Sequence, residues 1–459
     1  MTQAIAIPRG HTRTVAIVAA GITLGFAYTL SPLTVLALGV VAAASSAASR
    51  GLSQAERRWF WCVMSTAVLL RLLAIALLFL TADAARPFAS FFGDEELYKF
   101  RTVWVRNIGQ GIPISPADVI YSFDAVGNTS YMDVLAFVQV LVGDAPYGLH
   151  LLNMTLCLCG VLALYRLARA AYGRTVSMAG LIALLFLPSV FFWSISILKE
   201  PMNVFMLAGE LICAVFIVRA PRWWQKGLAA AGVVMFALAM ESLRAGGVLT
   251  AAMGTVGGIA LTWTLARGRR WMTALGLVPA TVVALALMPA VQDRVMANVR
   301  RVAFYHAGHV LTPGYSYRLV DIQYYSQRIQ LLNSMPPQDA GRFVVSALWN
   351  YMVQPLPWKA ESWALQAYLP ELFLWYVMAL LIPFGVLAGL RRDRVITSML
   401  LCHAAAAMVL VAVTSGNLGT LIRHRSLALP YLVWLSALGA QDCVRRYLRR
   451  YQGVEKERY

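Results

Sequence analysis

Three consecutive acidic residues, Asp94, Glu95 and Glu96, follow an apolar run that is long enough to cross a membrane. A carboxylate in such a place can accept a proton from a hydroxyl group during group transfer, and partial burial beside another charge tunes its basicity. Acidic residues are also favoured at the beginning of a helix by the helix dipole alone. The string therefore indicates either a catalytic carboxylate or an acidic helix N-terminus, and spacing alone does not choose between them.

Two adjacent charges, Lys199 and Glu200, interrupt an apolar region in which the other charged residue is Glu210. Charges at membrane depth are costly and usually mark a pathway or a site. In the alternative interpretation, both side chains reach the interface from a short outer loop and Pro201 opens the next helix. Both interpretations stay open.

Arginine occurs at two further places that we predict at the outer face. Glu241 and Arg244 stand three residues apart in a tight turn, where an ion pair is the simpler account. Arg423, His424 and Arg425 precede the last apolar run. Arginine outside the membrane departs from the positive-inside trend, and its forked donors suit phosphate. We therefore predict that Arg423 and Arg425 recognise a phosphate group.

His306 and His309 have the H-x-x-H spacing that places two imidazoles on one face of a helix. No acidic residue stands beside them, so the pattern indicates a metal site only weakly. The chain contains no P-loop, no G-x-G-x-x-G followed by an acid and no G-x-S-x-G. The sequence predicts no definite cofactor and leaves a divalent metal open.

The composition indicates that membrane-spanning helices position these residues. Of 459 residues, 59% are hydrophobic and only 13% are charged, with a mean hydropathy of +0.65. A soluble domain carries roughly 25% charged residues. The formal charge of +18 comes from short clusters between apolar runs, not from one continuous basic face, which argues against a nucleic-acid partner. The chain is therefore expected to be an all-α polytopic membrane protein.

A span needs about 20 helical residues, and we find about twelve apolar segments that could form one, of which the first two are short. We predict spans near residues 14–28, 33–47, 59–82, 151–170, 176–192, 202–218, 228–240, 246–265, 272–289, 370–390, 395–413 and 426–440. Basic clusters fall in alternate loops, which places those loops and both termini in the cytoplasm.

This topology places two large segments outside, 83–150 and 290–369, in a single transmembrane domain of residues 1–459. Residues 134–142 are apolar but too short to span, and we expect a helix along the membrane surface. The basic tail 442–459 is cytoplasmic. We expect membrane lipids to surround the predicted spans.

Three stretches resemble the GT-C superfamily of polytopic glycosyltransferases (family 39-like), which includes protein O-mannosyltransferases and the lipid A aminoarabinose transferase. The string Asp-Glu-Glu-Leu-Tyr at 94–98 is similar to the family's Asp-Glu-x-x-Tyr element. The segment 151–174 with Pro188 is similar to the family's next two helices. Arg-His-Arg at 423–425 with Pro430 is similar to an Arg-Tyr-Arg … Pro pattern before a late helix.

The resemblance implies a GT-C-like fold and an inverting transfer of a sugar from a polyprenyl-phosphate carrier to a lipid or glycan acceptor. It implies that Asp94 is the catalytic base, that Glu95 supports it and that Glu200 is a second acid. Residues that would bind substrate are Tyr98, Lys199, Arg244, Arg423, His424 and Arg425. The expected location is the outer face of a bacterial plasma membrane, in the synthesis of cell-surface glycans or polysaccharides.

Two alternatives stay open. A polysaccharide polymerase of the O-antigen type would rely on arginines of the second outer segment, such as Arg318, Arg328 and Arg342. A transporter would show ionisable residues at mid-membrane, and here Arg71 and Glu210 are the main examples. Most polar residues gather at one predicted face, which favours an enzyme.

Overall fold

The structure is a computed structural model that describes residues 31–81, 93–123, 129–143, 146–266, 288–311, 316–325, 333–360 and 362–456, with short pieces between 14 and 28. Within these ranges the secondary structure is helical, apart from one isolated antiparallel bridge between Ser316 and Asn417. The prediction of an all-α chain is confirmed for these residues.

Long apolar helices dominate the described part of the chain. Eight of them are long and apolar enough to cross a membrane, and two further helix pairs pass the same test together although each pair is bent. The eight are α2 (Pro32–Ser49), α3 (Gln54–Leu80), α7 (Pro146–Tyr172), α10 (Glu200–Arg219), α11 (Trp223–Leu243), α12 (Gly247–Ala266), α17 (Trp363–Arg392) and α18 (Arg394–Thr414). The chain is therefore a multi-pass membrane protein with eight to ten candidate spans in its described ranges.

The two bent pairs differ slightly in angle, and the first has a local cause. In the first, α8 (Arg174–Phe186) and α9 (Pro188–Ile195) meet at 59°, because Pro188 cannot donate to the preceding turn. In the second, α19 (Leu418–Arg425) and α20 (Leu429–Lys456) meet at 65°. These eight helices and two pairs coincide with ten of the twelve predicted spans. The predicted spans 14–28 and 272–289 lie largely outside the described residues.

The remaining helices belong to the two segments predicted outside the membrane. They are α4 (Gly93–Gly109), α5 (Pro116–Ser122), α6 (Ser130–Val142), α14 (Pro289–Leu311), η2 (Ile322–Tyr325), α16 (Pro337–Val353) and η3 (Pro357–Lys359). The apolar run 134–142 forms most of α6, a helix of 13 residues. It is too short to span, as predicted.

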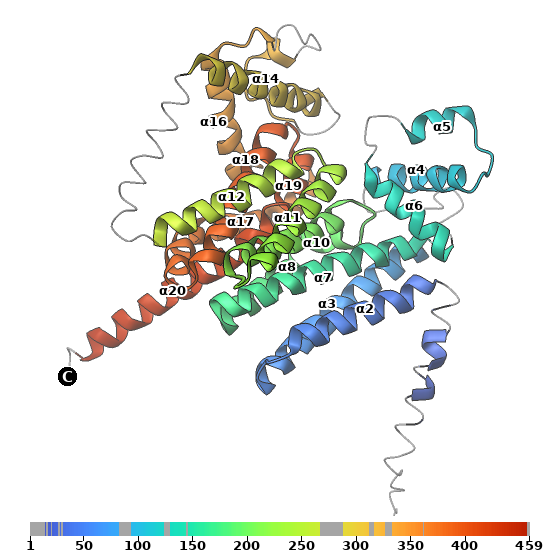
Figure 1. The fold of residues 1–459 in the computed structure, drawn as a ribbon, viewed down its shortest axis with the longest axis horizontal. Coiled ribbons are helices and arrows are strands. Elements are labelled where there is room, and N and C mark those ends of the chain that lie inside the picture. The colour runs from blue at the N-terminus through green and yellow to red at the C-terminus, as the bar shows by residue number, and fades with distance from the viewer. Residues whose placement is uncertain are drawn as a thin grey trace, which may run out of the picture. The chain divides into compact units, whose positions relative to one another are not determined.

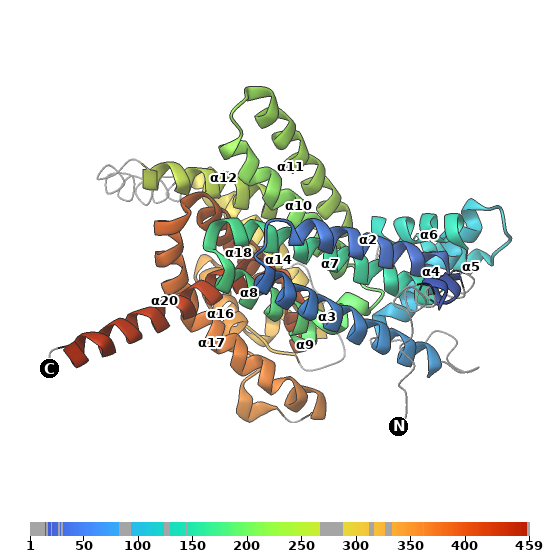
Figure 2. The same cartoon turned by 90° about the horizontal axis from the view of Figure 1, so that it is seen from below.

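The contacts group into two compact units, and the prediction of one transmembrane domain stays a prediction. Unit 1 comprises residues 1–159 and 192–202, and unit 2 comprises 160–191 and 203–459. In unit 1, α2 contacts α3, and α4 contacts both α5 and α6 (Figure 1). The same grouping of α4, α5 and α6 is visible in the second view (Figure 2).

In unit 2, glycine allows the closest helix contacts. The helices α12 and α18 pack together, and so do α17 and α20 (Figures 1 and 2). A Cβ atom on Gly254 would overlap the ring of His403, and one on Gly258 would overlap the sulfur of Met399. The two glycines are four residues apart on α12, the small-residue spacing that lets membrane helices approach each other.

Two histidines hold α14 against the end of α18. His306 Nδ1 donates to Ser415 O at 2.8 Å, and His309 Nδ1 donates to Thr414 O at 2.6 Å. The carbonyls at a helix C-terminus lack partners within the helix, so these bonds satisfy two of them. The H-x-x-H pair thus has a structural role here, and the described residues contain no group of three or more metal-ligating side chains.

Candidate functional site

The acidic string forms the first turn of α4, and its two leading carboxylates have opposite surroundings. Asp94 is exposed, whereas Glu95 is fully buried. Consecutive helical residues point about 100° apart, which lets one face outward while the next faces inward. The backbone N–H of Ile197 donates to Glu95 Oε2 at 2.8 Å. Glu95 therefore forms a hydrogen bond with the chain segment that contains Lys199 and Glu200.

That segment, residues 194–200, contains the end of α9, the non-helical residues 196–199 and the first residue of α10. Two side chains of α7 hold it. His150 Nδ1 donates to Ile195 O at 2.5 Å. Asn153 Nδ2 lies 2.5 Å from Ser196 O and 3.0 Å from Leu198 O. Main-chain groups outside a helix must find partners at membrane depth. Asn153 and His150 of α7 supply these partners.

The same amide reaches a buried tyrosine. Asn153 Nδ2 also donates to Tyr131 Oη at 2.7 Å, and the Tyr131 ring meets that of Tyr98 edge-on, with centroids 5.7 Å apart. Burial raises the pKa of Tyr131 well above its usual value, and the nearby charges of Glu200 and Glu95 raise it further. The structure thus brings Glu95, Tyr98 and Glu200 together around one phenol.

Cations accompany these acids inside unit 1. Lys99, one turn after Glu95, is almost fully buried. Burial lowers the pKa of Lys99, while the carboxylates of Glu95 and Glu96 oppose that shift. From α3, Arg71 is fully buried and donates from Nε to Ser194 Oγ at 2.8 Å. Segment 194–200 is therefore held from α3, α4 and α7.

In unit 2 the tight turn between α11 and α12 places a second set of predicted residues. Glu241 Oε2 accepts from the backbone N–H groups of Gly246 and Val248, both at 3.0 Å, and so caps the start of α12. The guanidinium of Arg244 donates to His424 Nε2. This contact joins the tight turn to α19.

Arg425 has contacts unlike those of a phosphate ligand. Its side chain is buried, and it donates to the main-chain carbonyls of Tyr351 and Gln354 at the C-terminus of α16. Its guanidinium carbon lies 5.0 Å from the ring centroid of Trp375. Arg423, on the same short helix, is only partly buried. The geometry favours a structural role for Arg425, and phosphate binding by Arg423 stays a prediction.

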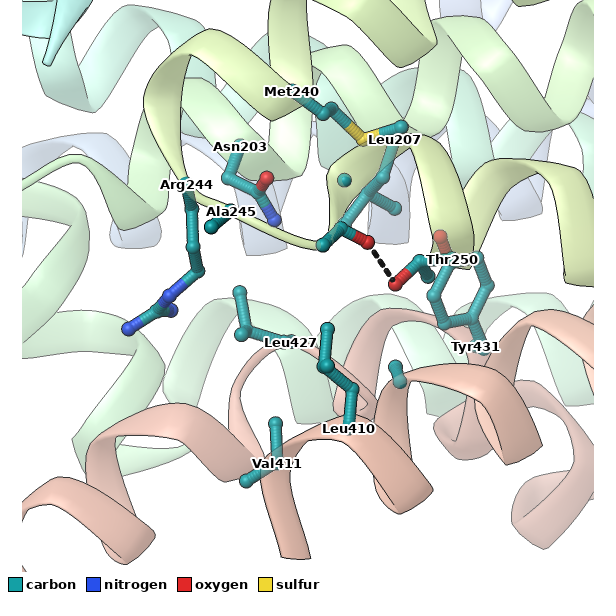
Figure 3. Close-up of a pocket in the computed structure, with 13 residues that line it drawn as sticks. Asn203, Leu207, Met240, Arg244, Ala245, Thr250, Leu410, Val411, Leu427 and Tyr431 are labelled. Carbon is teal, nitrogen blue, oxygen red and sulfur yellow. Dashed lines mark hydrogen bonds between the residues drawn. The ribbon is translucent and has the colours of Figure 1, made fainter. Parts of the chain in front are cut away.

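A small pocket opens beside Arg244. Figure 3 shows Arg244 and Tyr431 at opposite sides of it, with Leu410 and Leu427 between them. Its volume is about 40 Å³, enough for a few water molecules at roughly 10–15 Å³ each but too small for a sugar ring. Most of its lining is apolar, with Asn203, Arg244, Thr250 and Tyr431 as the polar members, and it does not admit a whole hexose.

The predicted site residues thus form two sets. Asp94, Glu95, Tyr98, Lys199 and Glu200 belong to unit 1, and the remainder belong to unit 2. His150, Asn153 and Tyr131 were not predicted as site residues, although polar side chains within apolar helices are a readable signal. The same signal marks His403 on α18. No family model, curated protein or solved structure matches this chain.

Proposed function

We propose that this protein is an inverting glycosyltransferase that moves a sugar from a polyprenyl-phosphate carrier to a lipid or glycan acceptor. The reaction takes place at the outer face of a bacterial plasma membrane, in the synthesis of cell-surface glycans. Both termini are cytoplasmic in this proposal, in keeping with the alternating basic clusters.

The observation that carries the proposal is the contrast between two neighbouring carboxylates. Asp94 is exposed at the first turn of α4, while Glu95 is buried and accepts from Ile197 N. Acidic residues that serve only to solvate a helix N-terminus would all be exposed. A catalytic base must be held in a fixed position, and a buried neighbouring carboxylate can hold it there. Glu95 fixes the start of α4, and with it Asp94, by accepting from the main chain of segment 194–200.

The step follows from the chemistry of a hydroxyl acceptor. Asp94 takes the proton of the acceptor hydroxyl as its oxygen bonds to the anomeric carbon of the sugar. The bond from that carbon to the carrier phosphate breaks, and its electron pair stays on the phosphate oxygen. Displacement from the opposite side inverts the configuration. Basic side chains stabilise the departing phosphate, and Arg244 and Arg423 are assigned this role.

Replacement of the proposed base is the test. Asp94→Asn should lower sugar transfer in membranes supplied with undecaprenyl-phosphate sugars by about 10²–10⁴-fold, the usual contribution of a positioned base. The amide keeps the shape of the side chain, so the free energy of unfolding should change by no more than about 1 kcal/mol, the contribution of one charge to the helix dipole. Glu96→Gln, an exposed acid in the same turn, is the matched control and should retain transfer. Near-normal transfer by Asp94→Asn would remove the base assignment.

One observation favours a second candidate, a transporter. Glu210 and His403 lie fully buried on candidate spans, and two candidate spans are bent pairs. Buried ionisable groups and broken helices are features of membrane transporters. Transfer of labelled sugar to an acceptor separates the two candidates, because a transporter moves its substrate without forming a new glycosidic bond.

A further inference from the structure

A carboxyl group and an imidazole meet inside the helices of unit 2. Glu210 on α10 and His403 on α18 are both fully buried. His403 Nε2 lies 3.1 Å from Glu210 Oε1 and 2.9 Å from Oε2. Thr255 Oγ1 on α12 donates to Glu210 Oε1 at 2.6 Å. Three helices thus contribute one polar group each to a site closed to solvent.

The partner of the other ring nitrogen decides how many protons the pair holds. His403 Nδ1 lies 2.8 Å from the carbonyl oxygen of Met399. A carbonyl only accepts, so this nitrogen carries a hydrogen. If Nε2 were bare and Glu210 ionised, a lone pair would face a carboxylate with no hydrogen between them. The short contact therefore requires one more proton, on either Nε2 or the carboxyl group.

Other neighbours leave this requirement unchanged. The ring of Tyr431 on α20 stacks on His403 with centroids 5.4 Å apart. The thiol of Cys213 on α10 interacts electrostatically with Glu210, and Cys402 faces Gly257 on α12. Phenols and thiols are neutral near pH 7 and bring no compensating positive charge. A bare carboxylate buried here would be costly.

We propose that Glu210 and His403 form a proton-binding site within the membrane-spanning helices, where the pair shares one proton across the neutral pH range. Tyr431 both stacks on His403 and lines the pocket beside Arg244, so the site adjoins that pocket. The inference is independent of the proposed function, since either an enzyme or a transporter can contain such a site.

The proton count has a measurable consequence for stability. Above about pH 7 an unfolded chain has an ionised glutamate and a neutral histidine, which together hold no proton at these two groups. The native pair holds one. Each unit of pH above 7 should therefore lower the pair's contribution to the folding equilibrium constant tenfold.

Glu210→Gln removes this dependence while keeping the contacts. Its amide can donate to His403 Nε2 and its oxygen can accept from Thr255, so the variant mimics the protonated carboxyl group. Equilibrium unfolding of the purified full chain in mixed micelles with increasing SDS, between pH 7 and 9, is the measurement. We expect the folding equilibrium constant of wild type to fall tenfold per pH unit relative to that of Glu210→Gln. Thr255→Val should be less stable but keep the wild-type slope.

A second variant uses a different pH window. In His403→Gln, Glu210 is the one group of the pair that can bind the proton. The unfolded variant therefore holds no proton at these positions above about pH 4.3, whereas unfolded wild type holds one on His403 up to about pH 6.5. Between pH 5 and 6 the folding equilibrium constant of this variant should fall tenfold per pH unit relative to that of wild type. The proposal would be overturned if the unfolding free energy changed with pH equally in wild type and both variants, in both pH ranges. The native pair would then hold no extra proton.

Discussion

At the residue scale, two buried charges in the described part of the chain, Glu95 and Arg425, are held by main-chain groups. Glu95 accepts from the backbone of Ile197, and Arg425 donates to the carbonyls of Tyr351 and Gln354. Each such bond connects two segments that are distant in sequence. The positions of these side chains are therefore coupled to the fold, and their replacement acts on stability as well as on any site.

Arg425 gives the clearest prediction of this kind. Removing its guanidinium leaves the C-terminal carbonyls of α16 without donors, and hydrogen bonds to a charged group contribute about 1.5–3 kcal/mol each. Arg425→Lys keeps the charge but has no forked donors, so unfolding in mixed micelles should become easier by about 3 kcal/mol or more.

The control lies two residues away. Arg423→Gln, on a partly exposed side chain of the same short helix, should change the free energy of unfolding by less than about 1 kcal/mol. Equal stability of Arg425→Lys and wild type would show that the buried guanidinium is not a structural anchor.

His306 makes a pH-dependent contact between α14 and the end of α18. Burial lowers the pKa of His306 to about 4, from an ordinary value of 6.5. The fold therefore favours the neutral ring: its contribution is complete above pH 6.5 and is lost as pH falls through 6.5 towards 4. Wild type should lose up to about 3 kcal/mol across this window from this group.

His306→Asn tests that contribution, because an amide can donate to Ser415 O without titrating. The difference in unfolding free energy between wild type and this variant should shrink as pH falls from 6.5 to 4. A difference that is constant with pH would mean that His306 is not held neutral by the fold.

At the element scale, the pair α17 and α20 depends on two glycines. A Cβ atom on Gly385 would overlap the carbonyl oxygen of Leu435, and one on Gly439 would overlap that of Leu381. These are main-chain atoms, which cannot rotate away as a flexible side chain can. The two helices therefore approach each other more closely than any other residue would allow.

Gly385→Ala should accordingly destabilise the protein by about 1–3 kcal/mol or more, the usual effect of overpacking. Gly227→Ala on α11, where nothing lies within 4 Å of an added Cβ atom, is the control and should be neutral or slightly stabilising. Thermal unfolding in detergent measures both. A Gly385→Ala protein as stable as the control would contradict the described packing of α17 on α20.

Element positions were largely predictable from the sequence, because hydropathy and basic clusters report directly on spans. The bend at Pro188 is also a local signal. The roles of individual polar residues were harder to predict, since they depend on partners far away in the chain. Arg425 reads as a phosphate ligand by its outer-face position, yet its partners are Tyr351 and Gln354, about 70 residues earlier.

The pair of Glu210 and His403 illustrates the same limit. Glu210 is visible as a charge within a span, but its partner is separated from it by 193 positions. The two residues meet because α10, α12 and α18 come together, and Gly254 of α12 leaves room for the ring of His403. Local patterns predict helices, whereas a site requires knowledge of which helices are neighbours.

At the scale of the whole molecule, the proposed acids and the proposed phosphate-binding arginines belong to different compact units. Each role can therefore be tested separately, the base by Asp94→Asn in unit 1 and the phosphate contacts in unit 2. Loss of transfer with retained carrier binding is expected for the first, and loss of carrier binding for the second.

The most direct test of the central claim is binding of undecaprenyl phosphate to the purified protein in nanodiscs, with undecaprenol as the uncharged comparison. We predict that wild type prefers the phosphate and that Arg244→Gln/Arg423→Gln binds it about 10–100-fold more weakly, as loss of charged hydrogen bonds implies. Arg222→Gln, an exposed arginine at the start of α11, should bind like wild type. Equal binding of phosphate and alcohol by wild type would contradict the account of a carrier-dependent glycosyltransferase.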